Sequence, residues 1–246
     1  MNKVMKIVVW NEYSEHQKKG ATHRAYPDSM HNTIAAIFKG HDDIAVNTAT
    51  FDMPENGLPD EVLNTTDVLI WWGHALHDRV PDALAEKIAK RVNDGMGIIF
   101  LHSSHLSKPF TKLMGTACSL RWREIGESER VWTTNPHHPI AAGITQGFKL
   151  KHEEMYGEHF DIPEPDSVVF VGWFRGGEVF RSGCTFTRGK GKIFYFQPGH
   201  ETFPIYHDEN IRKIIFNAAD WAGGRNKVIN DFKANPNCPY SRRMKR

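Results

Sequence analysis

The residues best suited to chemistry in this chain are its histidines, of which there are 14 among 246 residues. Several directly follow short apolar segments that have the composition of buried strands: His74 and His77 follow 67–72, His102 and His105 follow 97–101, and His200 follows 192–198. Because ligands bind beyond the carboxyl ends of the strands in an open parallel sheet, we expect these imidazoles to converge at one edge. Such a cluster indicates metal binding or proton transfer.

A second chemical feature is the acidic segment 151–160, which contains His152, Glu153, Glu154, Glu158 and His159. If this segment is extended, His152 and Glu154 share one face and Glu153 points to the other. A carboxylate beside two or three imidazoles suits a divalent metal such as zinc or manganese. We therefore predict a metal site formed by some of the residues His102, His152, Glu154 and His200, with His102, Glu154 and His200 as catalytic residues.

The same grouping also fits an acid/base site without metal, and it fits a dry hydrogen-bond network that only shapes a pocket. The HExxH pattern of a zinc-binding helix is missing, so the metal remains one of these alternatives. Around the site we predict a substrate-binding set that consists of His23, Tyr26, Trp72, His74, His105 and Tyr156. Trp72 stands at a strand end, where its aromatic face would suit the apolar face of a sugar.

The elements that must position these residues alternate in the first half of the chain. Buried strands are predicted at 4–10, 67–72 and 97–101 and a further strand at 44–51, with helices from about residue 28 and over 81–95. This order is typical of βαβ units around a parallel sheet. The second half predicts strands at 167–174, 178–188 and 192–198 and a last helix over 209–224. We therefore predict an α/β fold, a mainly parallel sheet flanked by helices, with added antiparallel strands in the second half.

Composition narrows the function classes. The chain has 40% hydrophobic and 24% charged residues and a net charge of +2, which is typical of a globular domain and does not suggest nucleic acid as a partner. No apolar run approaches a membrane span, and neither a P-loop nor a GxGxxG motif is present, so we expect no nucleotide cofactor. Three dispersed cysteines favour the reducing cytoplasm. We expect one domain over 1–224 and an extended, non-catalytic tail over 225–246.

The chain resembles the trehalose utilisation family, the ThuA-like proteins, along nearly all of its length. The segments that carry the resemblance, in order, are AYPDSMHNTIA (25–35), WWGHALHDRV (71–80), GMGIIFLHSSHLSKPF (95–110), LMGTACSLRWRE (113–124), HHPIAAGI (137–144), HEEMYGEHFDIP (152–163), GGEVFRSGCTF (176–186) and GKGKIFYFQPGHETFP (189–204). The resemblance implies the flavodoxin-like fold of the class I glutamine amidotransferases. In that fold the nucleophile is a cysteine at a tight turn after a central strand.

Here the equivalent stretch carries His102, Ser103 and Ser104 and no cysteine, whereas the late catalytic histidine matches His200. Glutamine hydrolysis through a thioester is therefore not expected. The resemblance instead implies a small-molecule substrate, trehalose or a related disaccharide, and an NAD-dependent sugar oxidoreductase as the functional partner. That partner would supply a 3-keto sugar, whose acidified C–H bonds invite proton abstraction of the isomerase or lyase type.

Two other functions stay open at this stage. The chain can be a non-catalytic sugar-binding or regulatory module on an amidotransferase-like scaffold. It can also be a serine hydrolase that uses Ser103 or Ser104 with His200, although no GxSxG motif surrounds either serine. A homo-oligomer is compatible with all three hypotheses. No membrane association is expected.

Overall fold

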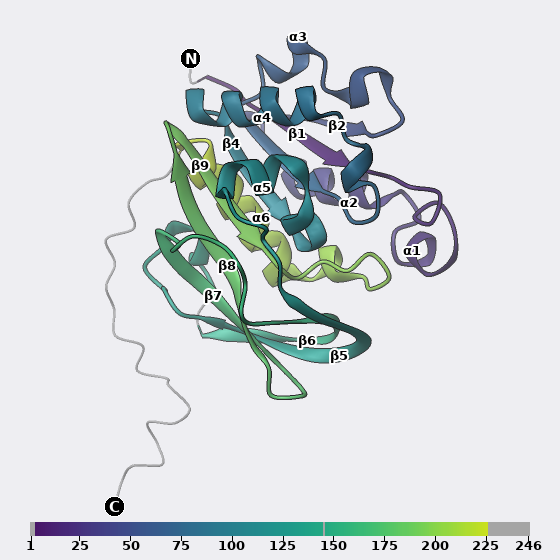
Figure 1. Ribbon diagram of the computed structural model, residues 1–246, viewed down its shortest axis with the longest axis vertical. Coiled ribbons are helices and arrows are strands. Elements are labelled where there is room, and N and C mark those ends of the chain that lie inside the picture. The colour runs from purple at the N-terminus through teal and green to yellow at the C-terminus, as the bar shows by residue number, and fades with distance from the viewer. Residues whose placement is uncertain (1–2, 145, 226–246) are drawn as a thin grey trace, which may run out of the picture.

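The computed structural model describes residues 3–144 and 146–225, which form one nine-stranded mixed sheet with the strand order β2-β1-β3-β4-β9-β8-β7-β5-β6 (Figure 1). The strands are β1 (Met5–Asn11), β2 (Ile44–Thr50), β3 (Val68–Trp72), β4 (Gly97–Leu101), β5 (Arg121–Thr133), β6 (Gly147–Gly157), β7 (Ser167–Phe174), β8 (Val179–Arg188) and β9 (Gly191–Phe196). The helices are α1 (Gly20–Ala25), α2 (Met30–Ala35), α3 (Asp60–Leu63), α4 (Asp82–Asp94), α5 (Lys108–Met114) and α6 (Glu209–Ala222).

The parallel half of the sheet determines the edge at which the candidate site lies. β2, β1, β3, β4 and β9 pair in parallel, and β3, β4 and β9 end together because Trp72 pairs with Leu101 and Leu101 pairs with Phe196. β3 and β4 are buried along their whole length, as expected of apolar strands in a parallel sheet covered on both faces. The residues that follow these strands therefore emerge at one edge, as the sequence predicted.

Helices cover both faces of this half, which confirms the predicted fold class. On one face, side chains from α2 and α6, such as Ile34 and Ile214, pack against Ile7 and Ile70. On the other, α4 and α5 contribute Ile88 and Phe110 to a second core with Trp71. The alternation of strand side chains between the two cores follows from the period of two along a strand.

The second half is antiparallel, and it includes a long hairpin that the sequence did not reveal. β5 pairs with both β6 and β7, while β8 pairs with β7 and with β9. The hairpin of β5 and β6 lies at the bottom of the view in Figure 1, opposite α3 and α4 at the top. It brings the predicted acidic segment, which forms the end of β6, to the carboxyl edge of the parallel strands.

The beginning of α6 gives a testable contribution to stability. The Asp208 carboxylate caps the helix by accepting hydrogen bonds from the backbone N–H groups of Asn210 and Ile211. We expect Asp208→Ala to cost about 1 kcal/mol and to lower Tm by roughly 2–4 °C, because these donors lose their partner. Asp208→Asn keeps a capping oxygen and should stay near the unmodified protein. Thermal unfolding followed by circular dichroism measures both variants, and an equal loss in both would exclude the cap as the cause.

The predicted tail, 225–246, lies outside the described residues except for Arg225, so the tail stays a prediction. Among residues 3–144 and 146–225, no helix is both long enough and apolar enough to cross a membrane.

Candidate active site

His102 stands at the turn that follows β4 and starts a short 3₁₀ helix, His102–Leu106. Its backbone adopts a left-handed conformation, with φ 53°, and its side chain is fully buried. Nδ1 donates a hydrogen bond of 3.0 Å to the backbone carbonyl of Gln197, just beyond β9. A carbonyl can only accept, so this bond keeps the proton on Nδ1 and leaves Nε2 available to a ligand, as is usual for metal-binding histidines.

Glu154 and His200 face this free nitrogen. Oε2 of Glu154 lies 3.1 Å from Nε2 of His102, and one ligand atom each from His102, Glu154 and His200 falls within 4.8 Å of the others. All three side chains are buried, and apart from the ion-pair contacts of His102 with Glu154 and of His200 with Glu124, these three atoms make no hydrogen bond among the described residues. Burying a polar atom without a hydrogen-bond partner destabilises the folded protein. Three such atoms that converge on one point therefore indicate a site for a bound metal or ligand.

This donor set fits a divalent metal. Two imidazoles and one carboxylate match the protein ligands of a catalytic zinc site, and the same donor types suit manganese. Nδ1 of His200 lies 2.8 Å from the Thr202 hydroxyl, and donation to that oxygen would leave Nε2 free for a metal. The three side chains are thus a candidate ligand set for such an ion.

The Glu153 carboxylate connects the backbone segments that carry Glu154 and His200. Its Oε1 accepts hydrogen bonds from the backbone N–H groups of Glu154 and His200, at 2.8 and 3.1 Å, and its Oε2 accepts one from Gly199 at 2.7 Å. One buried carboxylate thus ties β6 to the segment after β9. Burial raises the pKa of Glu153 to about 7, against these three hydrogen bonds and the charge of His102, which favour the ionised form. Both oxygens are occupied, so Glu153 is a positioning residue.

The electrostatics of the buried group favour an ion pair when no metal is present. Burial opposes the charged form of His102, but the adjacent Glu154 carboxylate outweighs it and raises the pKa of His102 to about 9. Burial also opposes ionisation of Glu154, and the His102 imidazolium still lowers the pKa of that carboxyl. Burial lowers the pKa of His200 to about 4, so this imidazole is neutral at pH 7 and able to act as a ligand.

A second pair, His74 and Glu201, lies beside the buried group. Nδ1 of His74 is 2.8 Å from Oε1 of Glu201, and the His74 ring centre lies 5.9 Å from that of His200. Although burial acts against it, the contact with His74 lowers the pKa of Glu201 to about 2. Glu12, after β1, fixes the loop by accepting hydrogen bonds from the backbone N–H groups of residues 74–76.

Three predicted substrate-binding residues form the walls of the site. Trp72 and Tyr156 each stack near-parallel on His102, with ring centres 6.3 and 5.3 Å away. His105 packs edge-on against Tyr156, and burial lowers its pKa to about 3. Trp72 is fully buried and donates a hydrogen bond to the carbonyl of Gly199. Trp72 therefore supports His102 from within the core, and the expectation that its face is open to a sugar is wrong.

Three other predictions need correction. His152 is exposed, with its Nδ1 bound to the carbonyl of Gly126, and it stands outside the metal-like group. Tyr26 is buried, and its hydroxyl donates to the carbonyl of Phe203 at 2.6 Å, so it is not open to a substrate. His23 is exposed on α1, and within the described part of the chain it makes no hydrogen bond or ion pair with the residues of the site.

The error about His152 has a local cause in β6. The register between β5 and β6 shifts around Glu127, and Glu153 and Glu154 are consecutive buried residues. Residues 153–157 are all buried, so both faces of β6 are covered at this end, whereas His152 belongs to the exposed part of the strand that precedes it.

Sequence reasoning also missed several residues at the site. Glu12 and Glu201 follow β1 and β9, so their position at strand ends was the available signal. Glu124, whose Oε1 lies 3.3 Å from Nε2 of His200, was missed because β5 itself was not recognised.

The fold and the site together define an α/β protein of the class I amidotransferase architecture, with a histidine at the turn after the central strand. The chain belongs to the ThuA family, described as trehalose utilisation, whose model matches residues 6–222. No curated protein matches the chain.

Solved structures agree with this architecture. A ThuA-like protein from Parabacteroides merdae has a TM-score of 0.69 at 12% identity, with 95% of both chains covered. One from Bacteroides uniformis has a TM-score of 0.64 at 14% identity, covering 89% of this chain and 91% of its own. A protein described as a GMP synthase component from Thermoplasma acidophilum has a TM-score of 0.51 at 13% identity, covering 92% and 97%. At these identities the likeness shows the fold alone.

Proposed function

We propose that this protein is a metal-assisted enzyme that acts on a 3-keto-disaccharide, such as 3-keto-trehalose, by abstracting a proton next to the ketone. The observation that carries the proposal is the buried group His102, Glu154 and His200, whose three converging atoms lack hydrogen-bond partners among the described residues. Membership of a trehalose utilisation family supports the substrate class. The reaction is of the isomerase or lyase type, since both begin with loss of the proton at C2.

The residues of the site have separate roles in the proposed reaction. A divalent ion held by His102, Glu154 and His200 would polarise the keto oxygen and stabilise the negative charge that develops on it. Glu153 keeps His200 and Glu154 in place through their backbone N–H groups. Trp72 and Tyr156 both stack on the ring of His102 and hold its orientation.

His74 is the group we assign to proton transfer. Its Nδ1 is held by Glu201, which leaves Nε2 to take the proton from C2, and its side chain is 35% exposed, so substrate can reach it. A histidine oriented by a carboxylate is a common general base. Glu153 does not fill this role, because its oxygens are taken by backbone donors.

The proposed reaction needs a supply of oxidised sugar. An NAD-dependent sugar oxidoreductase would convert a hydroxyl at C3 into the ketone, and this protein would consume the product. We place both steps in the cytoplasm. The free, buried thiols of Cys118 and Cys184 are compatible with a reducing compartment.

A second function, a non-catalytic sugar-binding module, is favoured by the contacts that His200 makes without a metal. The backbone N–H of Thr202 donates to Nδ1 of His200 at 3.3 Å, and Oε1 of Glu124 lies 3.3 Å from Nε2. This is how a neutral histidine with its proton on Nε2 would be held in a metal-free network. His102 and Glu154 would then remain an ion pair.

Exchange of hydrogen in deuterated water tests the proposed function. The protein, loaded with zinc or manganese, is incubated with 3-keto-trehalose, and incorporation of deuterium at C2 is followed by NMR. We expect exchange or product formation with the metal-loaded protein, and its loss after removal of the metal by a chelator. Exchange that survives complete metal removal would support metal-free acid/base chemistry. No exchange and no product under any condition would favour the binding module.

A further inference from the structure

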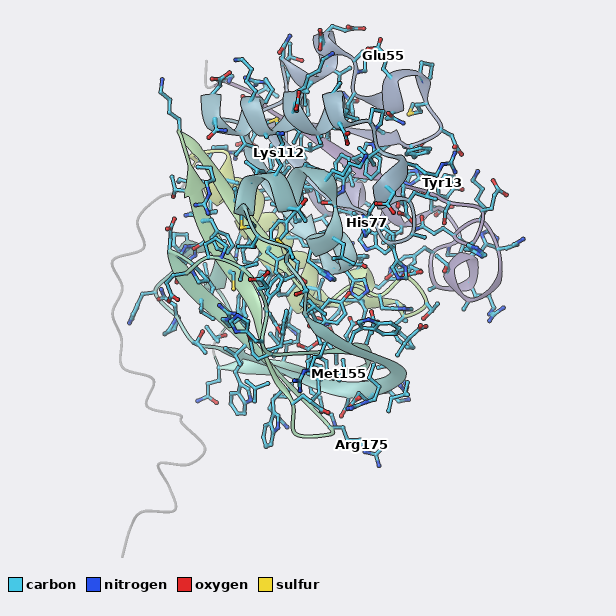
Figure 2. All side chains as sticks on the ribbon, in the orientation of Figure 1. Tyr13, Glu55, His77, Lys112, Met155 and Arg175 are labelled. Carbon is cyan, nitrogen blue, oxygen red and sulfur yellow. The ribbon has the colours of Figure 1, made fainter. Side chains whose placement is uncertain are left out.

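A groove opens next to the buried group, where β5 begins and β6 ends. It has a volume of about 780 Å³ and is lined by residues 121–124, 155, 157–158 and 178–179. This volume lies within the range of roughly 300–1,000 Å³ that small-molecule sites occupy. In Figure 2, Met155, which lines the groove, and Arg175, in the turn between β7 and β8, lie toward the same lower end of the molecule.

Two residues of β5 place the groove beside the candidate active site. Glu124 lines the groove and brings its Oε1 to 3.3 Å from Nε2 of His200. Trp122 also lines the groove and pairs across the hairpin with Tyr156. Tyr156 in turn stacks on His102. Glu124 thus connects the groove to His200, and Trp122 connects it, through Tyr156, to His102.

Trp122 is unusually exposed for its size. Its relative exposure is 65%, whereas Trp10, Trp71 and Trp72 are all at 1% or below. An exposed indole beside polar groups offers a flat apolar face for stacking, and the carbon-bound hydrogens of a pyranose ring form a matching apolar face. The exposed side chain of Trp122 has no role in the core, so removing it should not disturb folding.

The charges around the groove favour a neutral ligand. Three carboxylates line it, those of Glu124, Glu158 and Glu178, against the guanidinium groups of Arg121 and Arg123. Arg123 is bound to Glu127 and Glu178, each at 2.7 Å, and Arg181, which is not part of the lining, holds Glu158 at 2.9 Å. With Glu158 and Glu178 paired to arginines, Glu124 and Arg121 remain in the lining, so the groove has no excess of positive charge that would select a phosphorylated sugar. Hydroxyl groups, in contrast, can donate to the carboxylates and accept from the guanidinium groups.

We propose that this groove binds the second, unreacted sugar unit of a neutral disaccharide, with Trp122 as the stacking platform and Glu124 as the link to the buried group. The proposal rests on the proposed function for the identity of the reacting unit. It adds a specificity-determining residue, Trp122, and it predicts a preference for a disaccharide over a single sugar unit. The recognition of the second unit does not require oxidation or turnover.

Binding of unoxidised trehalose, measured by isothermal titration calorimetry, tests the groove separately from catalysis. We expect the unmodified protein to bind trehalose more tightly than glucose. Trp122→Ala should raise the Kd for trehalose by about tenfold, because a large stacking surface is lost, and leave glucose binding and metal content unchanged. Trp122→Phe should restore most of the affinity. Trp173→Ala is the matched control, since Trp173 is 50% exposed on β7 but does not line the groove.

The outcomes separate this proposal from the proposed function. No trehalose binding by the unmodified protein, an unchanged Kd in Trp122→Ala, or an equal loss in Trp173→Ala would each overturn the groove as a sugar site. Trehalose binding that depends on Trp122, together with no exchange or product from 3-keto-trehalose, would keep the groove and reject the catalytic proposal.

Discussion

Glu154→Gln is expected to remove metal binding and turnover together while the protein stays folded. The substitution replaces the carboxylate ligand with a weaker amide donor next to His102 and His200. We expect metal affinity to fall by at least about 100-fold, because losing even the partner of a ligand typically costs 10–100-fold. Metal content is measured by elemental analysis after equilibration with zinc or manganese, and turnover is measured on 3-keto-trehalose.

His152→Gln is the matched control for this experiment. His152 is two positions away on β6 and was a ligand candidate from the sequence, but the structure leaves it exposed and outside the group. This variant should keep both metal content and turnover. Circular dichroism shows whether Glu154→Gln is folded, which matters because removing one partner of a buried ion pair is destabilising. A folded Glu154→Gln protein with full metal content would refute the assignment of Glu154 as a ligand.

The parallel half of the fold could be predicted because each of its strands is recognisable from its own apolar sequence. The segments at β3 and β4 are continuous apolar runs, and α4 begins after Pro81 and ends at Gly95. Strands that are buried on both faces are apolar along their whole length. Their position and ends can therefore be predicted without knowledge of the partner strands. This is also why the convergence of His102 and His200 could be predicted, since β4 and β9 are parallel neighbours.

β5 could not be predicted for the opposite reason. Its first half is mostly exposed and charged, with Trp122 and Ile125 open to solvent, and Gly126 adopts a positive φ of 67° within it. Its identity as a strand depends on pairing with β6, across a long connection, and with β7, which begins more than thirty residues further along the chain. Propensity for strand formation depends on such neighbours, and the sequence alone does not contain them in readable form.

The aromatic residues of the site show a similar limit. Tyr26, Trp72 and Tyr156 are all amphipathic side chains, and they occur both at rims and in cores. In the structure all three are buried, and the hydroxyl of Tyr26 and the indole of Trp72 bind backbone carbonyls. Trp122, in contrast, is exposed. Which aromatic faces the substrate is decided by the long-range packing of the β5–β6 hairpin.

His74→Gln should separate proton transfer from metal binding. Glutamine has no basic nitrogen, so the variant keeps hydrogen-bonding capacity toward Glu201 but cannot accept the proton from C2. We expect kcat to fall by about 10²–10⁴-fold, the usual contribution of a positioned general base. Metal content should not change, because His74 is outside the group of His102, Glu154 and His200. Deuterium incorporation at C2 should fall with kcat.

His23→Gln serves as the control, because His23 is exposed on α1 and should affect neither quantity. Loss of metal from His74→Gln would show that His74 supports the ligands, and the proton would then need another acceptor. The nearest remaining carboxylate with an exposed side chain is Glu124, at 3.3 Å from His200. Full exchange at C2 in His74→Gln, with metal retained, would exclude His74 as the base and direct the same measurement to Glu124→Gln.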